Sequence, residues 1–232
     1  MTGSIFHLAI STGLFVGLHL FLSSRTVRRP LIGRLGKWGF TGVFAAISAA
    51  LLTWSISAYL AAPLVGLYEP NTAMRHASLS LMLFAAFFVV AGYTTPNPGI
   101  VGMETRGLQS GARGILKITR HPAMWGVALW GISHILGNGH LAALIFFGGF
   151  IILALAGAAH IDAKRRAKHG ADWQAFEDAT SFWPMGAILA GRTRMERGDI
   201  RWWQSLLSIA LYIGMLWMHA RMGRDVFPMA FF

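Results

Sequence analysis

The chain has 232 residues, of which 55% are hydrophobic and only 12% are charged, about half the charge of an ordinary soluble domain. A soluble core of this length could not bury so much apolar side chain. The composition therefore excludes a soluble enzyme, a disordered tail and a fibrous repeat. The net charge of +11 indicates cytoplasmic loops of a membrane protein, with no nucleic acid as partner, and the absence of cysteine excludes thiolate chemistry.

Apolar runs along the chain predict an all-α, polytopic membrane helical bundle of about six transmembrane helices, because a spanning helix needs about 20 apolar residues. The runs cover residues 4–22, 38–62, 77–93, 122–136, 141–158 and 203–219. The third run ends at 94–99, where two prolines cannot continue a helix. The glycine-rich turn 137–139 predicts that the fourth and fifth runs form a tight helical hairpin.

The basic residues alternate between the connecting segments. Segments 23–37, 94–121 and 159–202 hold 17 of the 20 Lys and Arg residues. Arg75, Arg221 and Arg224 fall in the remaining segments. Because cytoplasmic loops collect Lys and Arg, the pattern predicts a multi-pass protein of the cell inner membrane with both termini on the non-cytoplasmic side.

The pattern of basic and aromatic residues over 159–180 predicts an amphipathic cytoplasmic helix that lies on the membrane surface. Its Lys and Arg residues would face lipid headgroups, while Trp173 and Phe176 would point into the membrane. The alternative is an ordinary basic loop. Because no repeat or linker interrupts the chain, we expect one membrane domain over 1–232.

Nine histidines are the unusual feature of so apolar a chain, because an imidazole inside a bilayer is costly and tends to have a partner or a function. His19 and His134 both lie inside apolar runs. A hydrogen-bonded packing role is the alternative for either one. The spacing matches no His-Glu-x-x-His motif and no carboxylate cluster, so it favours haem, whose iron takes two axial imidazoles from different helices.

A second candidate site is the run from Arg120 to Pro122. Proline suits the first turn of a helix, which places Arg120 and His121 beside unpaired backbone N–H groups and the positive end of the helix dipole. We expect an anionic group to bind there, either a haem propionate or a lipid phosphate. The alternative is that Arg120 anchors the chain at the interface and His121 caps the helix.

Several motifs carry a resemblance to a known family. They are Gly114–Pro122, Trp130–His134, Asp162–Gly170, Thr180–Pro184 and Ala190–Arg192. Together they resemble the NnrU family of membrane proteins, which includes the 15-cis-zeta-carotene isomerases. The most specific part is 114–192, and His19 with Arg25 downstream is a weaker match.

The resemblance implies a protein that binds haem b, with His19 and His134 as iron ligands and catalytic residues. Its reaction would be a redox-dependent cis–trans isomerisation of a lipophilic polyene, with membrane lipid as surroundings and an electron donor as partner. Plant members carry a cysteine one turn before the second histidine, where this chain has Gly131. No switch to a thiolate ligand is therefore possible here.

Helix depth leaves the pairing of the histidines open. His19 lies near the cytoplasmic end of its helix, whereas His134 lies about 18 Å from the cytoplasmic start of its own helix at 1.5 Å per residue. By depth alone, His76 or His7 would suit His134 better as a partner.

Two other functions remain open at this point. The first is an NnrU-type factor in denitrification and nitric oxide metabolism, acting as a haem sensor of a diatomic gas or as an electron-transfer protein. The second is a membrane S-adenosylmethionine-dependent methyltransferase, because such enzymes resemble this chain in the Arg-His-Pro helix start. They also carry a pair of glutamates on a later helix, where this chain has Ile161 and Asp162.

Overall fold

The computed structural model describes residues 3–221, which form helices and connecting loops without a strand. The α-helices are α1 (Ile5–Ser23), α2 (Arg25–Ala61), α3 (Thr72–Thr94), α4 (Glu104–Ser110), α5 (Pro122–Asn138), α6 (Leu141–His169), α7 (Ala171–Ala179), α8 (Gly186–Leu189) and α9 (Trp202–Arg221), with a short 3₁₀ helix η1 (Gly114–Lys117) between α4 and α5. Each predicted apolar run falls largely within one of these helices.

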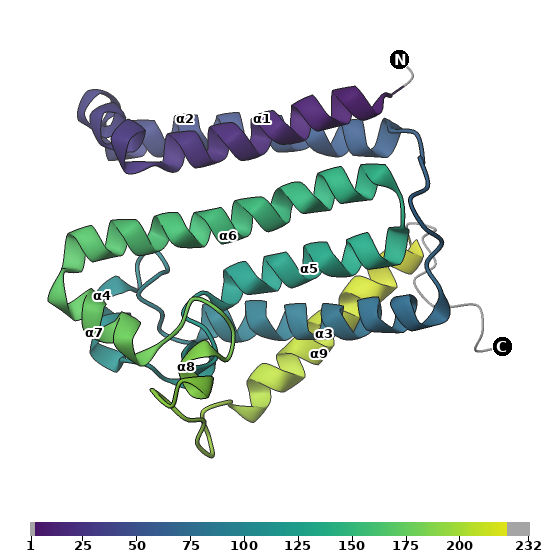
Figure 1. Cartoon of the computed structure of the whole chain (residues 1–232). Coiled ribbons are helices and arrows are strands. Elements are labelled where there is room, and N and C mark those ends of the chain that lie inside the picture. The colour runs from purple at the N-terminus through teal and green to yellow at the C-terminus, as the bar shows by residue number, and fades with distance from the viewer. Residues whose placement is uncertain (1–2, 222–232) are drawn as a thin grey trace.

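The long helices are arranged in layers (Figure 1). The hairpin of α1 and α2 lies on one side of α6, and α5 and α3 follow on its other side, with α9 crossing α3 obliquely. The start of α1 and the end of α9 lie at the same end of the bundle, as an even number of traversals requires (Figure 1).

The chain is an all-helical membrane protein, as predicted, although the number of spans is a separate matter. Among the described residues, four helices are long and apolar enough to cross a membrane: α1, α2, α3 and α6. Helix α5 has only 17 residues, and α9 is not among the four. Six spans, the inner membrane and the orientation of the termini therefore stay predictions.

Helix α2 has 37 residues and is bent within its first third. Gly36 has φ 71° and ψ 166°, a conformation that glycine adopts without a Cβ clash. The segment before Gly36 is rich in arginine, whereas the segment after it is the second predicted apolar run. The bend separates a basic segment at the end of the bundle from the membrane-crossing part of α2.

The predicted hairpin of the fourth and fifth apolar runs is present as α5 and α6. Helix α5 ends at Gly139, whose φ of 66° is left-handed and whose N–H donates to the Ile135 carbonyl. The carbonyl of Gly139 accepts from the N–H groups of Leu67 and Tyr68. The loop between α2 and α3 is thereby fastened to the tip of the hairpin.

The prediction of one membrane-surface helix over 159–180 is wrong. Helix α6 continues to His169, and after a break at Gly170 the separate helix α7 turns back. Trp173 and Phe176 are 0% and 4% exposed and pack against α3 and η1. The basic residues instead occupy the last turns of α6, where positive charge suits the helix dipole, so the aromatic face of α7 meets protein in place of lipid.

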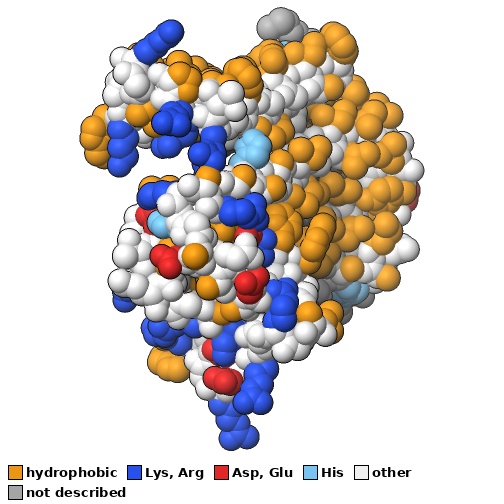
Figure 2. Space-filling view, turned by 60° about the vertical axis from the view of Figure 1, so that its left-hand side comes forward, with side chains coloured by type: hydrophobic (Ala, Val, Ile, Leu, Met, Phe, Trp, Pro, Cys, Tyr) orange, Lys and Arg blue, Asp and Glu red, His pale blue; other side chains and the backbone are white. Residues whose placement is uncertain are grey.

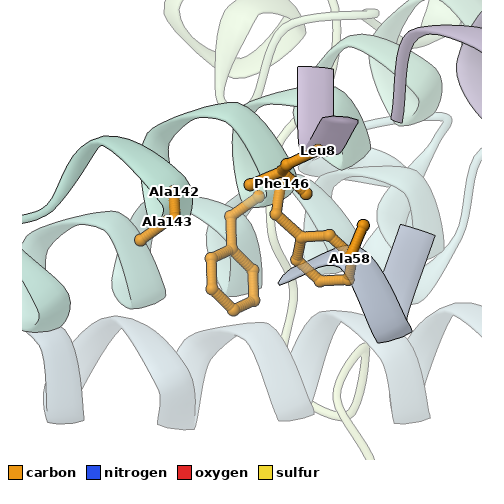
Figure 3. Close-up of a cluster of buried hydrophobic side chains, with 6 residues drawn as sticks. Leu8, Ala58, Ala142, Ala143 and Phe146 are labelled. Carbon is orange, nitrogen blue, oxygen red and sulfur yellow. The ribbon is translucent and has the colours of Figure 1, made fainter. Parts of the chain in front are cut away.

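The two ends of the bundle have different cores. At one end, α1, α2 and α6 pack through Leu8, Ala58 and Phe146 (Figure 3). At the other end, α7 packs on η1 and α3, and charged side chains gather on the surface there, whereas hydrophobic side chains cover the flank (Figure 2). We call this charged end the cap, which comprises α4, η1, α7, α8 and the end of α6. Arg224, which the charge pattern placed at the opposite end, lies outside the described residues.

Candidate functional site

A cavity of about 1000 Å³ lies within the bundle between α2, α3, α5, α6 and α9. Its walls are mainly aliphatic and aromatic side chains, among them Leu52, Met82 and Phe150. Two histidines line it, His134 from α5 and His219 from α9. A large apolar cavity with a few convergent polar groups is the usual form of a small-molecule site.

His134 is held in a fixed orientation by its surroundings. Its ring stacks on Phe147 at a centroid distance of 4.5 Å, and Trp130 packs beside it at 4.9 Å. Its Nδ1 lies 2.9 Å from the carbonyl oxygen of Trp130. Because a carbonyl oxygen only accepts, Nδ1 carries the proton and Nε2 keeps its lone pair.

His219 repeats this arrangement on α9. Its Nδ1 lies 2.8 Å from the carbonyl oxygen of Met215, which again leaves the lone pair on Nε2. The rings of His134 and His219 are 5.9 Å apart between centroids, with their planes 39° apart. The two histidines lie 85 residues apart on different helices, so no local spacing predicts that they meet.

His19 has a different environment from His134. It lies between α1 and α2, with its Nδ1 3.2 Å from the Ser48 hydroxyl and its ring against Phe15 and Phe44, and it does not line the cavity. Phe147, which stacks on His134, packs in one cluster with Leu8 of α1. Among the described residues, the ring neighbours of His19 and those of His134 are different, and no contact joins the two histidines.

The two alternative partners from the sequence also lie away from the cavity wall. His7 accepts a hydrogen bond at its Nε2 from the Trp54 indole at 2.6 Å. His76 is half-buried near the start of α3, and its neighbours Arg75 and Ser78 line the cavity while it does not.

The run from Arg120 to Pro122 does begin a helix, with Pro122 at the first position of α5 and His121 at its N-cap. The protein's own carboxylates lie beside Arg120. Arg120 donates to Asp162 Oδ2 from Nε and Nη2 at 2.9 and 2.7 Å, and Nη2 lies 3.2 Å from Glu177. Nε and Nη2 of Arg120 are thus paired within the protein, and the binding of a propionate or lipid phosphate by Arg120 stays a prediction.

His121 completes this network from the other side. Its Nε2 lies 2.6 Å from Asp162 Oδ1, and its side chain is only 2% exposed. The sequence did not single out Asp162 as a partner, although acidic residues are few in this chain and this one directly follows an apolar span. Because Asp162 is bonded to Arg120 and His121, it offers no free carboxylate to a methyltransferase cofactor.

A second ion pair joins η1 of the cap to the loop before α9. Lys117 Nζ donates to Asp199 at 2.9 Å, and this hydrogen bond raises the pKa of Lys117 above its usual value. Burial alone would raise the pKa of Asp199, but hydrogen bonds from Lys117 and from the backbone N–H groups of Glu196 and Gly114 lower it further than burial raises it. Both groups therefore remain charged over a wide pH range.

The cavity, unlike the cap, has features that fit a haem. The described residues contain no group of three or more His, Cys, Asp or Glu side chains that could hold a bare metal ion, but haem iron takes only two axial protein ligands. The cavity offers two imidazoles with Nε2 lone pairs and apolar walls. Arg75 is the one Lys or Arg among the described residues that line it, and a haem carries carboxylates for such a cation.

Gly131 of α5 lies in close contact with α6. A Cβ at this position would lie 2.7 Å from Ile151 Cγ1 and 3.0 Å from the Phe147 carbonyl oxygen. Contacts this short require the helices to move apart, so glycine is here because no side chain fits. A thiol one turn before His134 is excluded by packing as well as by the absence of cysteine.

Comparisons with known proteins extend the resemblance. The model of the NnrU protein family matches residues 7–225. A chloroplastic 15-cis-zeta-carotene isomerase of Zea mays is 29% identical over 122 residues, 53% of this chain and 33% of the maize protein. The corresponding protein of Arabidopsis thaliana is 29% identical over 117 residues, 50% of this chain and 32% of that protein. The matched part thus spans about a third of these relatives, and no solved structure matches the chain.

Proposed function

Because the chain belongs to the NnrU family, we propose that it is a membrane-embedded isomerase that acts on a lipophilic polyene with the help of haem b. The observation that carries this proposal is the apolar cavity of about 1000 Å³ within the bundle, lined by His134. A hydrocarbon substrate dissolves in the bilayer and gains most from an apolar site at that depth. The two isomerase relatives support the substrate class.

The residues of the cavity determine how a long substrate would lie. Aromatic rings of Trp130, Phe147 and Phe150 form one wall next to His134. Their mutual edge-to-face contacts, with centroids 5.0 and 5.3 Å apart, keep that wall rigid. Haem would supply a reducible iron when bound, for which an electron donor is needed, and His134 would hold it from the α5 side.

The test is isomerisation by the purified full chain in detergent. A 15-cis polyene of the zeta-carotene type is incubated with the haem-loaded, reduced protein, and the isomers are separated by chromatography. We expect conversion to the trans isomer only with the reduced protein. Absence of conversion with a fully haem-loaded, reduced sample contradicts the proposal.

A matched pair of variants localises the reaction to the cavity. Leu52 lines the cavity and its neighbour Leu51 does not. Leu52→Trp fills part of the space, so we expect at least tenfold slower conversion, whereas Leu51→Trp should retain the rate. Equal rates in both variants would place the substrate elsewhere.

A second candidate function is a haem protein that binds a diatomic gas or transfers electrons, as in denitrification or nitric oxide metabolism. The observation that favours it is Gly131, since packing against Ile151 leaves no room for a thiol ligand beside His134. The test is reduction of the purified protein under carbon monoxide. A shifted Soret band without polyene conversion supports the gas-binding function, whereas an unshifted band without conversion leaves electron transfer.

A further inference from the structure

We infer that His219 of α9 completes a two-imidazole site with His134 of α5, so that a haem iron in the cavity is bound between these two residues and not between His134 and His19. This inference deepens the proposed function and rests on haem being its cofactor. It concerns which of this chain's residues hold the iron, and it stands or falls separately from the reaction.

The distance between the two rings suits a shared iron. An imidazole nitrogen binds a first-row metal at about 2.0–2.1 Å, so two rings on opposite sides of one ion have nitrogens ~4 Å apart and centroids ~6 Å apart. The centroids of His134 and His219 are 5.9 Å apart. His19 instead packs between α1 and α2, against Ser48, Phe15 and Phe44, and it does not line the cavity that His134 and His219 share.

The tautomers of both histidines suit metal binding. A metal-binding histidine usually donates its other ring N–H to a backbone carbonyl or a carboxylate, which fixes the ring and directs the lone pair at the metal. His134 and His219 both do this, through Nδ1 to the carbonyls of Trp130 and Met215. Among the described residues, neither Nε2 has a hydrogen-bond partner, whereas Nε2 of His7 is occupied by Trp54.

The composition of the cavity also suits a haem. A polar imidazole inside a membrane is costly unless it is partnered, and here two of them face one apolar cavity. Arg75, the single Lys or Arg among the described residues of the lining, also hydrogen-bonds the Pro70 carbonyl through Nε. A guanidinium is of no use to a pure hydrocarbon, but it pairs with a carboxylate. Imidazoles and a guanidinium in one cavity therefore point to an iron porphyrin with propionates.

The experiment uses the full chain, purified and loaded with haemin, with the ferric spectrum and the electron paramagnetic resonance spectrum as readouts. We expect the unmodified protein to be six-coordinate and low-spin. His219→Ala and His134→Ala should each convert the iron to high-spin and weaken haem retention about tenfold or more. His19→Ala and His7→Ala serve as matched intramembrane controls and should remain low-spin.

Two further measurements distinguish loss of the iron ligand from loss of the fold in the variants. Imidazole added to His219→Ala should restore the low-spin spectrum, because the free base can occupy the place of the missing ring. His219→Met should give a six-coordinate haem with a shifted spectrum. A fully low-spin His219→Ala protein, or conversion to high-spin in His19→Ala alone, overturns the inference.

The outcomes distinguish this inference from the proposed function. If haem is low-spin and sensitive to His219 while no polyene is converted, the inference stands and the isomerase proposal falls. If the polyene is converted but only His19→Ala and His134→Ala alter the spectrum, the isomerase proposal stands and this inference falls. If the unmodified protein takes up no haem, the inference is wrong.

Discussion

The cap and the cavity differ in how completely their polar side chains are paired. In the cap, Arg120 is matched by Asp162 and Glu177, and Lys117 by Asp199. In the cavity, His134 and His219 satisfy one nitrogen each on their own helix and present the other to an apolar space. Charges at the end of the bundle are thus used to join segments of chain, whereas the imidazoles at membrane depth are left able to bind a ligand.

The largest effect is expected from removing the Asp162 carboxylate, which Arg120 and His121 share. Asp162→Ala leaves Arg120 and His121 buried without their main partner, which typically costs about 3–5 kcal/mol of the free energy of unfolding. We expect a large fall in melting temperature in detergent, measured by tryptophan fluorescence. Asp172→Ala, an exposed position on α7, is the control and should be nearly neutral. Equal melting temperatures would mean that the cap does not depend on this ion pair.

The stability of the cavity wall should depend on close packing and not on charge pairs. Gly131→Ala adds a Cβ that meets Ile151 and the Phe147 carbonyl, and overpacking of this kind costs about 1–3 kcal/mol. Gly148→Ala has no neighbouring atom within 4 Å of the added Cβ, so its better helix propensity should leave stability unchanged or slightly higher. The two melting temperatures in detergent provide the check, and a destabilised Gly148→Ala protein would contradict this explanation.

The second ion pair of the cap predicts a pH dependence. Because the pKa of Asp199 is lowered, its contribution is present above the ordinary carboxyl pKa and is lost as the pH falls through the folded value. Because the pKa of Lys117 is raised, its contribution is present below the ordinary amine pKa and is lost as the pH rises through the folded value. The pair should stabilise the cap by about 1–2 kcal/mol between these limits.

The measurement is the difference in melting temperature between the unmodified protein and Asp199→Asn as a function of pH. The difference should be constant near neutral pH and shrink towards zero below about pH 4. A difference in melting temperature that grows on acidification would contradict the lowered pKa of Asp199.

The smallest effect concerns a polar contact at membrane depth outside the cavity. The hydroxyls of Thr12 and Ser55 join α1 to α2 at 2.8 Å, and both residues are buried. Interhelical hydrogen bonds in membrane proteins average about 0.6 kcal/mol, so Thr12→Val should lower stability by about that amount. Thr53→Val, at an exposed position of α2, is the control, and a loss above 2 kcal/mol would show that such contacts dominate this layer.

The helices themselves could be predicted from the sequence, because apolar runs of spanning length and their proline and glycine boundaries are local signals. The break at Gly170 had a local signal that the prediction did not use, since basic residues followed by glycine are typical of a helix C-terminus. The surface helix was predicted instead because the aromatic residues of α7 resemble those that enter a membrane.

The site could be predicted only in part. His134 was found because an imidazole in an apolar run is conspicuous. Its neighbour His219 and the link from Arg120 to Asp162 depend on which helices touch, and the spacing of residues along one helix does not encode that. His19 matches the family pattern, but a sequence match does not say how far two residues lie apart in space. Its pairing with His134 therefore stays a prediction.

The length of α6 gives the protein a built-in sensitivity to bilayer thickness. From Leu141 to His160 the helix rises about 30 Å, which equals a typical hydrocarbon core, and Asp162 follows immediately. In a thinner bilayer α6 would have to tilt, and because Asp162 is bonded to Arg120 at the start of α5, the two helices would tilt together. Lipid chain length should therefore alter the shape of the cavity through hydrophobic mismatch, and reconstitution into lipids of graded chain length would reveal an optimum.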